Sequence, residues 1–312
     1  MQIYREVYSV SSQYFAPRGR ERLMFLGEHI AQKHLHFSDK LIGIVGDAGS
    51  GKSSLIKGMF PGLELSNDDD VINPRKIMQV KEGLESFSDA GSYHIDMRFQ
   101  MAFTQMFEIV EFVKKTLERD KRIIVEHFEQ LYPALGINAD IMVGIGEEVI
   151  VTRPSIFGPL PESIFDIVHK SLTSRKMAHT AEDVTMQLLE NEFGVSDKSY
   201  FSSDIRKGFV LRFLDKPNID LDRLGKRIEE KLAQNVSVSY FDEDHIKIGD
   251  EIIECDGPRL HVSNTSGVED FYLVKRIVHD PKTSTWCLVG LIGNNSCDLE
   301  NRNTVHFLKR KD

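Results

Sequence analysis

Cysteine, tryptophan and proline are scarce in this chain of 312 residues, which has 3 Cys, 1 Trp and 10 Pro. The cysteines (Cys255, Cys287 and Cys297) are odd in number and confined to the C-terminal part of the sequence. They exclude a disulfide framework and are typical of a reducing compartment. No apolar run approaches the roughly 18 to 20 residues that a membrane span needs, and the opening MQIYREVYSVSS lacks the order of a signal peptide. We therefore expect a cytoplasmic protein with no membrane partner.

Positive charge is also in short supply, since 39 Lys and Arg face 48 Asp and Glu, for a formal net charge of -9. A large nonspecific nucleic-acid surface needs clustered Lys and Arg, so the balance argues against one, although a local basic groove stays open. With 41% hydrophobic and 28% charged residues, the composition is that of an ordinary globular protein. The length is about twice that of a usual domain, which predicts two domains.

The first half alternates short apolar runs with helical stretches, the order typical of a parallel sheet connected by helices. Residues 41–45, LIGIV, read as a buried strand, and a helix is expected from Lys52. Residues 98–117 have apolar side chains on a 3.6-residue period and predict one helix. The following RIIVEHF predicts another buried strand, and residues 141–154 predict two more short strands.

Prolines and a glycine between Pro154 and Pro161 predict a linker, so we expect domains of residues 1–160 and 161–312. In the second domain, residues 162–193 predict a helix broken near Ser174, and residues 219–232 predict another. Strands are expected in GFVLRFL, VSVSYF, HIKIG, EDFYLVKRIV and STWCLVGLIG. The pattern is that of an α+β domain with a largely antiparallel sheet.

The segment Gly46 to Ser53 fits GxxxxGK[ST], with a predicted strand before it and a predicted helix after it. Glycines let the backbone wrap so that its N–H groups point at phosphate oxygens, and the start of the helix adds its positive dipole end. Lys52 is expected to reach the β and γ phosphates of ATP, and Ser53 to ligate Mg²⁺. The predicted nucleotide-binding residues are Gly46, Ala48, Gly49, Ser50, Gly51, Lys52, Ser53 and Ser54.

An acidic side chain at the end of a later strand is needed to hold the metal shell or to polarise water. Glu126, which closes RIIVE, is the best placed candidate. Asp69, in the run Asp68 to Asp70, is a second catalytic candidate as the proton acceptor from a substrate hydroxyl, although such loops are often plain turns. Asp96 and Arg98 suit substrate contact or, preferably, a surface ion pair.

Through GDAGSGKSS and the Asp run, residues 41–154 resemble the P-loop kinase group that includes uridine kinase. The resemblance implies a three-layer α/β P-loop domain with a mainly parallel sheet, which binds ATP and Mg²⁺. Arginines of a lid helix, usual in that group, are missing, although Arg153 is a candidate to stand over a base.

His179 and Asp183 are spaced i and i+4 in a predicted helix, so both project from one face. Far along the chain, Cys255 and His261 lie in ECDGPRLHV, a turn that leads into a predicted strand. A thiolate, two imidazoles and a carboxylate are acceptable donors for tetrahedral Zn²⁺, so these four residues form a candidate metal site. Taken singly, each also suits an ordinary structural role.

The segments HTAEDVTMQLL, GFVLRF, IDLDRLGKRIEEKLAQNVSV and CDGPRLHVSNTSGVEDFYLVKRI resemble the second additional domain of alanyl-tRNA synthetase, which also occurs in free-standing editing proteins. The resemblance implies an α+β fold, hydrolysis of mischarged seryl- or glycyl-tRNA, and zinc held by an HxxxH and a CxxxH pair. It assigns His179, Cys255 and His261 as ligands. Asp183 stands in place of the second histidine, and the interval from Cys255 to His261 is two residues longer.

Three functions agree with these patterns. The first is an ATP-binding, P-loop kinase-like domain coupled to an editing-like domain that hydrolyses or recognises mischarged aminoacyl-tRNA. The second is a kinase for a small nucleoside-like or amino-acid-like molecule. The third is a nonenzymatic sensor of ATP and metal. All three share the nucleotide, and the sequence does not choose the acceptor or the oligomeric state.

Overall fold

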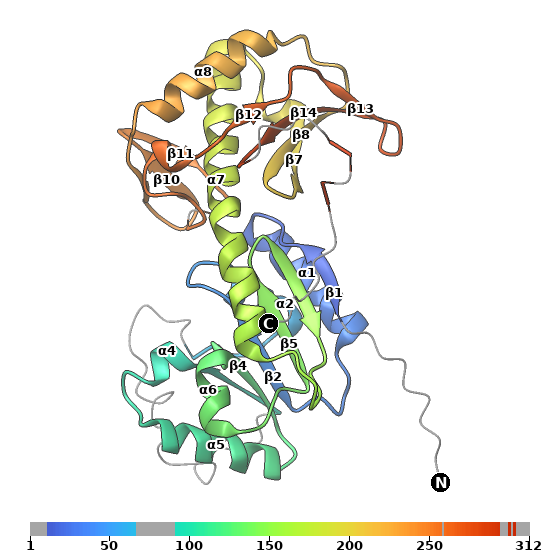
Figure 1. Ribbon diagram of the computed structural model, residues 1–312, viewed down its shortest axis with the longest axis vertical. Helices are drawn as coiled ribbons and strands as arrows, with labels where there is room; N and C mark the ends of the chain where they lie inside the picture. The colour runs from blue at the N-terminus through green and yellow to red at the C-terminus, as the bar shows by residue number, and fades with distance from the viewer. Residues whose placement is uncertain (1–10, 67–90, 258, 294–298, 301, 304–312) are drawn as a thin grey trace. The chain divides into compact units, whose positions relative to one another are not determined.

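The computed structural model describes residues 11–66, 91–257, 259–293, 299–300 and 302–303. It is a mixed α/β fold that divides into two compact units, the first of Met1–Tyr14 and Glu21–His169, the second of Phe15–Arg20 and Lys170–Asp312 (Figure 1). The division falls within helix α7 (Pro161–Phe193), nine residues after the boundary between residues 160 and 161 expected from the prolines. Among the residues described, no helix combines the length and hydropathy that a membrane span requires.

The first unit is built on one mixed sheet of six strands in the order β1-β6-β5-β2-β4-β3. Strands β3, β4, β2 and β5 run parallel to one another, and β6 is antiparallel to β5. Four parallel strands agree with the mainly parallel sheet expected from the sequence. The strands are β1 (Ser12–Phe15), β2 (Leu41–Val45), β3 (Ser92–Asp96), β4 (Arg122–Glu126), β5 (Ile141–Ile145) and β6 (Glu148–Thr152).

Helices pack on both faces of this sheet, because its central strands are apolar on both sides. On one face, Gly43 leaves room for Phe128, and Gly144 leaves room for Ile164 and Val168. On the other face, the β2 side chains of Ile42 and Ile44 are fully buried, and Figure 1 places α1 and α2 on that side. The helices are α1 (Arg20–His34), α2 (Lys52–Met59), α4 (Met97–Gln100), α5 (Met106–Glu118) and α6 (Phe128–Leu135).

Two predicted helices were wrong, because one is divided where a single helix was expected and the other is unbroken where a break was expected. Residues 98–117 form α4 and α5 rather than one helix, because the Glu108 carboxylate accepts the Gln105 backbone N–H at 2.8 Å and begins a new helix there. Residues 161–193 form one unbroken helix of 33 residues, with no break at Ser174. Serine and threonine cost a helix only a few tenths of a kcal/mol each, and burial of neighbours such as Leu172 outweighs that cost.

The second unit packs the later part of α7 and helix α8 (Leu221–Ala233) against antiparallel sheets, around a core that includes Phe209, Leu224 and Leu288. One sheet has the order β11-β10-β9 and the other β12-β14-β8-β7, with β13 beside β14. The elements are η2 (Asp197–Ser199), β7 (Tyr200–Ile205), β8 (Gly208–Phe213), β9 (Val238–Tyr240), β10 (His245–Ile248), β11 (Glu251–Glu254), η3 (Thr265–Gly267), β12 (Tyr272–Leu273), β13 (Val278–Asp280) and β14 (Thr285–Leu291).

The antiparallel pairing of this unit agrees with the sequence prediction. The segment EDFYLVKRIV, however, is not one strand. It supplies only β12 and the first residue of β13, with a connection between them.

Candidate functional site

The glycine-rich loop from Gly46 to Gly51 joins β2 to α2 at the carboxyl ends of the parallel strands. Gly46 has φ 149°, and a Cβ there would lie 2.6 Å from the Ile145 carbonyl oxygen. Gly51 has φ 99° immediately before α2, and a Cβ there would meet a Leu23 methyl at 2.5 Å. Only glycine fits both positions, so the sequence requirement for glycine has a steric cause.

Lys52, the first residue of α2, is 5% exposed. Its Nζ donates to the Asp47 carbonyl oxygen at 2.9 Å and lies 3.7 Å from Glu126 Oε2. Burial lowers the pKa of Lys52, and the nearby negative charges of Glu126 and Asp96 offset only part of that effect. An ammonium group has three N–H donors, so this buried charge is incompletely compensated and favours an added anion.

Glu126 is the last residue of β4. This strand lies next to β2, and Glu126 is in register with Ile44 of β2. Its Oε1 accepts hydrogen bonds from Ser53 Oγ at 3.4 Å and from His94 Nε2 at 3.2 Å. Burial alone raises the pKa of Glu126, but the hydrogen bond from His94 and the charge of Lys52 outweigh it, so the pKa lies below its ordinary value. The predicted acid therefore stands as a carboxylate beside Lys52 and Ser53.

Asp69 lies outside the described residues, as do its neighbours Asp68 and Asp70. A different carboxylate reaches this edge of the sheet, because Asp96 ends β3 in register with Glu126. Asp96 is buried, so the surface position expected for it was wrong, and it accepts the Arg98 and Phe99 N–H groups at the start of α4.

Asp96, Glu126 and His127 each place a potential ligand atom within 4.8 Å of the others. His127 is held at φ 58°, a strained region for a residue other than glycine. In the sequence, the only indication of this cluster was that the strands now identified as β3 and β4 each end in an acidic residue.

The remaining loop residues differ in exposure. Ala48 and Gly49 are exposed, Ser53 and Ser54 are partly buried, and Ser50 is fully buried, with no hydrogen-bond partner for its Oγ among the residues that the structure describes. Arg153 lies elsewhere, since its guanidinium is bound to Asp39, which precedes β2, at the opposite end of the strand from the glycine-rich loop. It is therefore not placed to stand over a nucleotide base.

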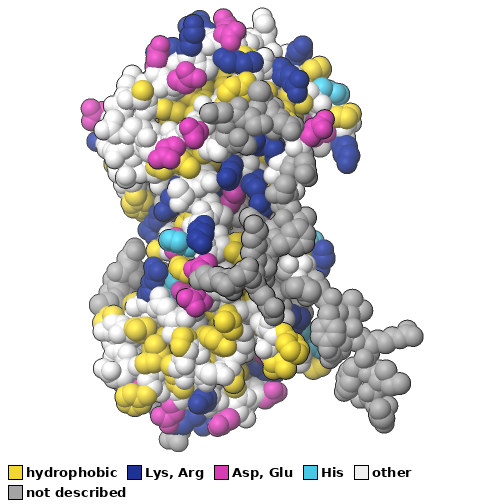
Figure 2. Space-filling model, in the orientation of Figure 1, with side chains coloured by type: hydrophobic (Ala, Val, Ile, Leu, Met, Phe, Trp, Pro, Cys, Tyr) yellow, Lys and Arg dark blue, Asp and Glu magenta, His cyan; other side chains and the backbone are white. Residues whose placement is uncertain are grey.

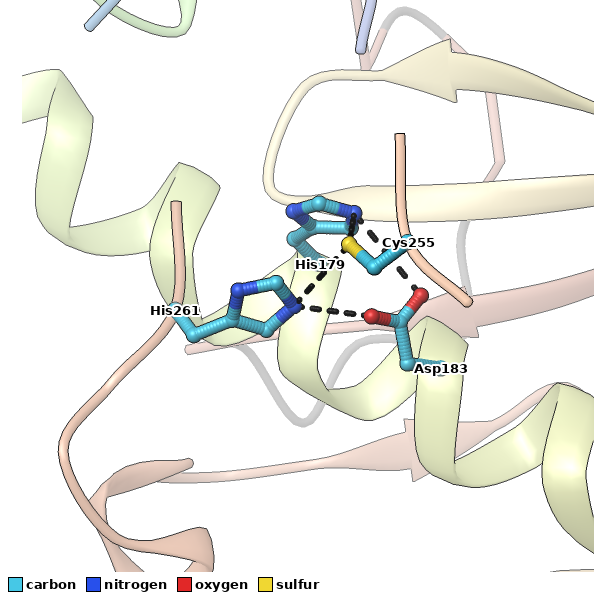
Figure 3. Close-up of side chains that lie close together, drawn as sticks. All are labelled: His179, Asp183, Cys255 and His261. Atoms are coloured by element: carbon cyan, nitrogen blue, oxygen red, sulfur yellow. Dashed lines mark hydrogen bonds and ion pairs between the residues drawn. The ribbon is translucent and has the colours of Figure 1, made fainter. Parts of the chain in front are cut away.

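In the second unit, His179, Asp183, Cys255 and His261 come together, with ligand atoms all within 4.8 Å of one another (Figure 3). Cys255 Sγ lies 3.6 Å from His179 Nε2 and 3.8 Å from His261 Nε2. Asp183 lies 2.7 Å from His261 Nε2 and 3.7 Å from His179 Nε2. Donor atoms bound at 2.0–2.3 Å to one tetrahedral ion lie about 3.3–3.8 Å apart, which the separations of 3.6, 3.7 and 3.8 Å match. The 2.7 Å between Asp183 and His261 Nε2 is a hydrogen-bond distance, which a shared Zn²⁺ would lengthen.

Local contacts hold the four side chains in place. His179 and Asp183 are on one face of α7, as their spacing predicted. Between them, Thr180 Oγ1 accepts the Val262 N–H at 3.2 Å, which ties the segment of His261 to the helix. The Gly257 N–H donates to Cys255 Sγ at 3.4 Å.

The surroundings of His179 and Cys255 set the protonation of these two buried side chains. Burial is the largest cause that lowers the pKa of His179 far below its usual value, and electrostatic interactions with His261, Arg18 and Arg175 add to it, so the His179 imidazole is neutral. Burial and the charge of Asp183 raise the pKa of the Cys255 thiol. Neutral imidazole is ready to bind a metal, whereas the thiol must first lose its proton.

Sequence reasoning did not anticipate the buried arginines beside this cluster. Arg18 Nε is 2.8 Å from Glu182, and its Nη2 is 2.9 Å from Asp204. Nothing in the sequence of residues 18–22, RGRER, indicated that the charge of Arg18 would be buried in the second unit.

Compared with known proteins, the sequence matches no family model, and no curated protein matches it either.

Proposed function

We propose that the first unit is a P-loop kinase-like unit that binds ATP with Mg²⁺ at the glycine-rich loop. The observation that carries the proposal is Lys52, a buried ammonium whose partners among the described residues are one carbonyl oxygen and one carboxylate at 3.7 Å. It opens an eight-residue helix whose first N–H groups add a positive dipole end. A triphosphate supplies the negative charge that this arrangement favours.

Each residue then has a distinct task. The loop backbone and Lys52 bind the β and γ phosphates, and Ser53, with Glu126 close by, would hold Mg²⁺. The metal would neutralise charge that develops on the phosphate oxygens. Asp96, at the end of the neighbouring strand, is placed to accept a proton from an acceptor hydroxyl. The sequence resemblance to the P-loop kinase group supports the same reading.

The test is ATP binding, measured by the fluorescence of an ATP analogue in the presence of Mg²⁺. Lys52→Ala should weaken binding by at least about tenfold, because a hydrogen bond to a charged group contributes about 1.5–3 kcal/mol. Lys57→Ala, on the same helix, is the matched control and should bind as the wild type does. Equal affinity of all three proteins for ATP would refute the assignment.

A second function concerns the metal cluster. We propose that His179, Asp183, Cys255 and His261 bind zinc in an editing-like domain. Four protein donors fill a tetrahedral ion, which favours a zinc that holds the loop of residues 255–261 against α7 over one that activates water. Recognition of aminoacyl-tRNA remains the activity that the sequence resemblance suggests. On the face in Figure 2, acidic and basic side chains are interspersed rather than gathered into a basic area.

Metal analysis of the purified protein tests this second proposal. About one zinc per chain is expected, lost in Cys255→Ala and retained in Cys287→Ala, which removes the other buried cysteine of the described residues. Seryl-tRNA deacylation and ATP turnover with bulk tRNA then distinguish the alternatives. Deacylation that disappears in Cys255→Ala would indicate an editing enzyme. Phosphate transfer to a small molecule, lost in Lys52→Ala, would indicate a kinase, and tight binding without product would indicate a sensor.

A further inference from the structure

A continuous chain of hydrogen bonds runs behind Glu126. The Ser66 backbone N–H donates to His94 Nδ1 at 2.9 Å, and His94 Nε2 lies 3.2 Å from Glu126 Oε1. The same Oε1 accepts from Ser53 Oγ, while Oε2 faces Lys52. His94 thus joins the backbone after α2 to the carboxylate beside the glycine-rich loop.

The tautomer of His94 follows from its partners. A backbone N–H only donates, so Nδ1 must accept from Ser66 and the ring proton of the neutral imidazole must lie on Nε2. Nε2 is therefore the donor to Glu126. The Asp96 N–H donates to Ser66 Oγ at 3.0 Å and holds Ser66 in place, with its Oγ also 3.0 Å from Nδ1.

Strand register brings these groups onto one face of the sheet. β3 and β4 are parallel, with His94 opposite Ile124 and Asp96 opposite Glu126. His94 and Glu126 are therefore diagonal neighbours on the same face. The His94 side chain is 0% exposed and that of Glu126 is 2% exposed, so water is not available to replace the hydrogen bond between them.

We propose that His94 is a positioning residue that fixes the Glu126 carboxylate in the orientation in which it and Ser53 receive the Mg²⁺ of the nucleotide. This inference rests on the proposed function of the first unit. His94 binds neither phosphate nor metal itself. Its N–H occupies one lone pair of Oε1 and prevents rotation of the carboxylate, in the way that outer hydrogen-bond partners orient metal ligands.

Two substitutions separate the donor from the bulk of the ring. His94→Gln places an amide N–H as far out as Nε2 and keeps a donor to Glu126. His94→Asn reaches only as far as Nδ1, so it keeps a partner for Ser66 and loses the donor to Glu126. The apparent Mg²⁺ affinity of each protein is measured at saturating ATP analogue, and the affinity for the analogue is measured without Mg²⁺.

The expected pattern is specific to orientation. His94→Asn should weaken Mg²⁺ binding by about tenfold or more, the range found when an outer partner of a metal ligand is removed. Its Mg²⁺-free nucleotide affinity should stay within about threefold of wild type, and His94→Gln should resemble wild type in both measurements. Equal Mg²⁺ affinity in Asn and wild-type proteins, an equal loss in Gln and Asn, or a parallel loss of Mg²⁺-free nucleotide affinity would each overturn the proposal.

A second measurement does not depend on nucleotide binding by any variant. In the ¹⁵N spectrum of the imidazole rings, His94 should have its proton on Nε2, with the signal identified by its absence in His94→Gln. A proton on Nδ1 would overturn the inference even if His94→Asn does not fold. Failure of the wild-type protein to bind ATP is a different result, since it would refute the proposed function and the positioning role with it.

Discussion

At the scale of single residues, the clearest ionic contact of the first unit joins Asp39 to Arg153. The two guanidinium nitrogens Nη1 and Nη2 each lie 2.7 Å from a carboxylate oxygen of Asp39. Burial alone raises the pKa of Asp39, but the hydrogen bonds from Arg153 and from the His36 N–H outweigh it and lower the pKa. The pair connects the segment that leads into β2 with the residue that follows β6.

Replacement of Arg153 by Gln should destabilise the protein in a pH-dependent way. At pH 7 we expect a loss of about 2 kcal/mol, less than for a fully buried pair because the Arg153 side chain is 44% exposed. A lowered carboxyl pKa contributes stability above its unfolded value near 3.9, and the contribution is lost as the pH falls through the folded value. Urea unfolding of wild type and Arg153→Gln at pH 7 and near pH 3 measures the difference.

The gap between the two unfolding free energies should therefore shrink in acid. A gap that stays constant between pH 7 and pH 3 would contradict the ionic account. Arg276→Gln, at an exposed position in the second unit, is the control and should have little effect at either pH.

At the scale of elements, the packing of α1 on α2 depends on two glycines. A Cβ at Gly58 would lie 2.0 Å from the Met24 carbonyl oxygen, and one at Gly27 would lie 2.3 Å from that of Leu55. Backbone atoms cannot move aside as a flexible side chain does. The close approach of the two helices therefore fixes α2, and with it Lys52.

Gly58→Ala should destabilise the protein by about 1–3 kcal/mol, since overpacking outweighs the gain in helix propensity of up to about 1 kcal/mol. Gly225→Ala in α8 is the matched control, because the nearest atom to its new Cβ is the flexible Lys275 Nζ at 3.3 Å. That variant should be neutral or slightly stabilised. Equal effects of the two substitutions on the thermal unfolding temperature would argue against a steric cause.

Elements with strong local patterns were the ones predicted from sequence. The strand at 41–45, the start of α2 at Lys52 and the spacing of His179 and Asp183 on one helix follow from apolar runs and periodicity alone. The approach of Cys255 and His261 to that helix depends on long-range packing, so donor types could suggest the site, with support from a family resemblance, but could not show that the segments meet. Asp96 was misjudged because a single acid in HIDMRF gives no sign that β3 lies beside β4.

At the scale of the whole molecule, the course of the chain ties one unit to the other. Residues 15–20 belong to the second unit, although the rest of β1, which ends at Phe15, and of α1, which begins at Arg20, is part of the first. Arg18 in this segment is paired with Glu182 and Asp204, and the side chains of Arg18 and Glu182 are 4% and 3% exposed. A chain that began at residue 161 would therefore lack the partner of two carboxylates.

Arg18→Met should lower the stability of the second unit by about 3–5 kcal/mol, because removal of one partner leaves buried charge uncompensated. The ATP binding that we propose for the first unit should persist, since the described contacts of Lys52 and Glu126 lie within that unit. Calorimetry of the full chain with and without ATP measures both effects: the transition that ATP does not shift should move to lower temperature. If instead both transitions move together, the two units unfold cooperatively and the buried network stabilises the whole chain rather than one part of it.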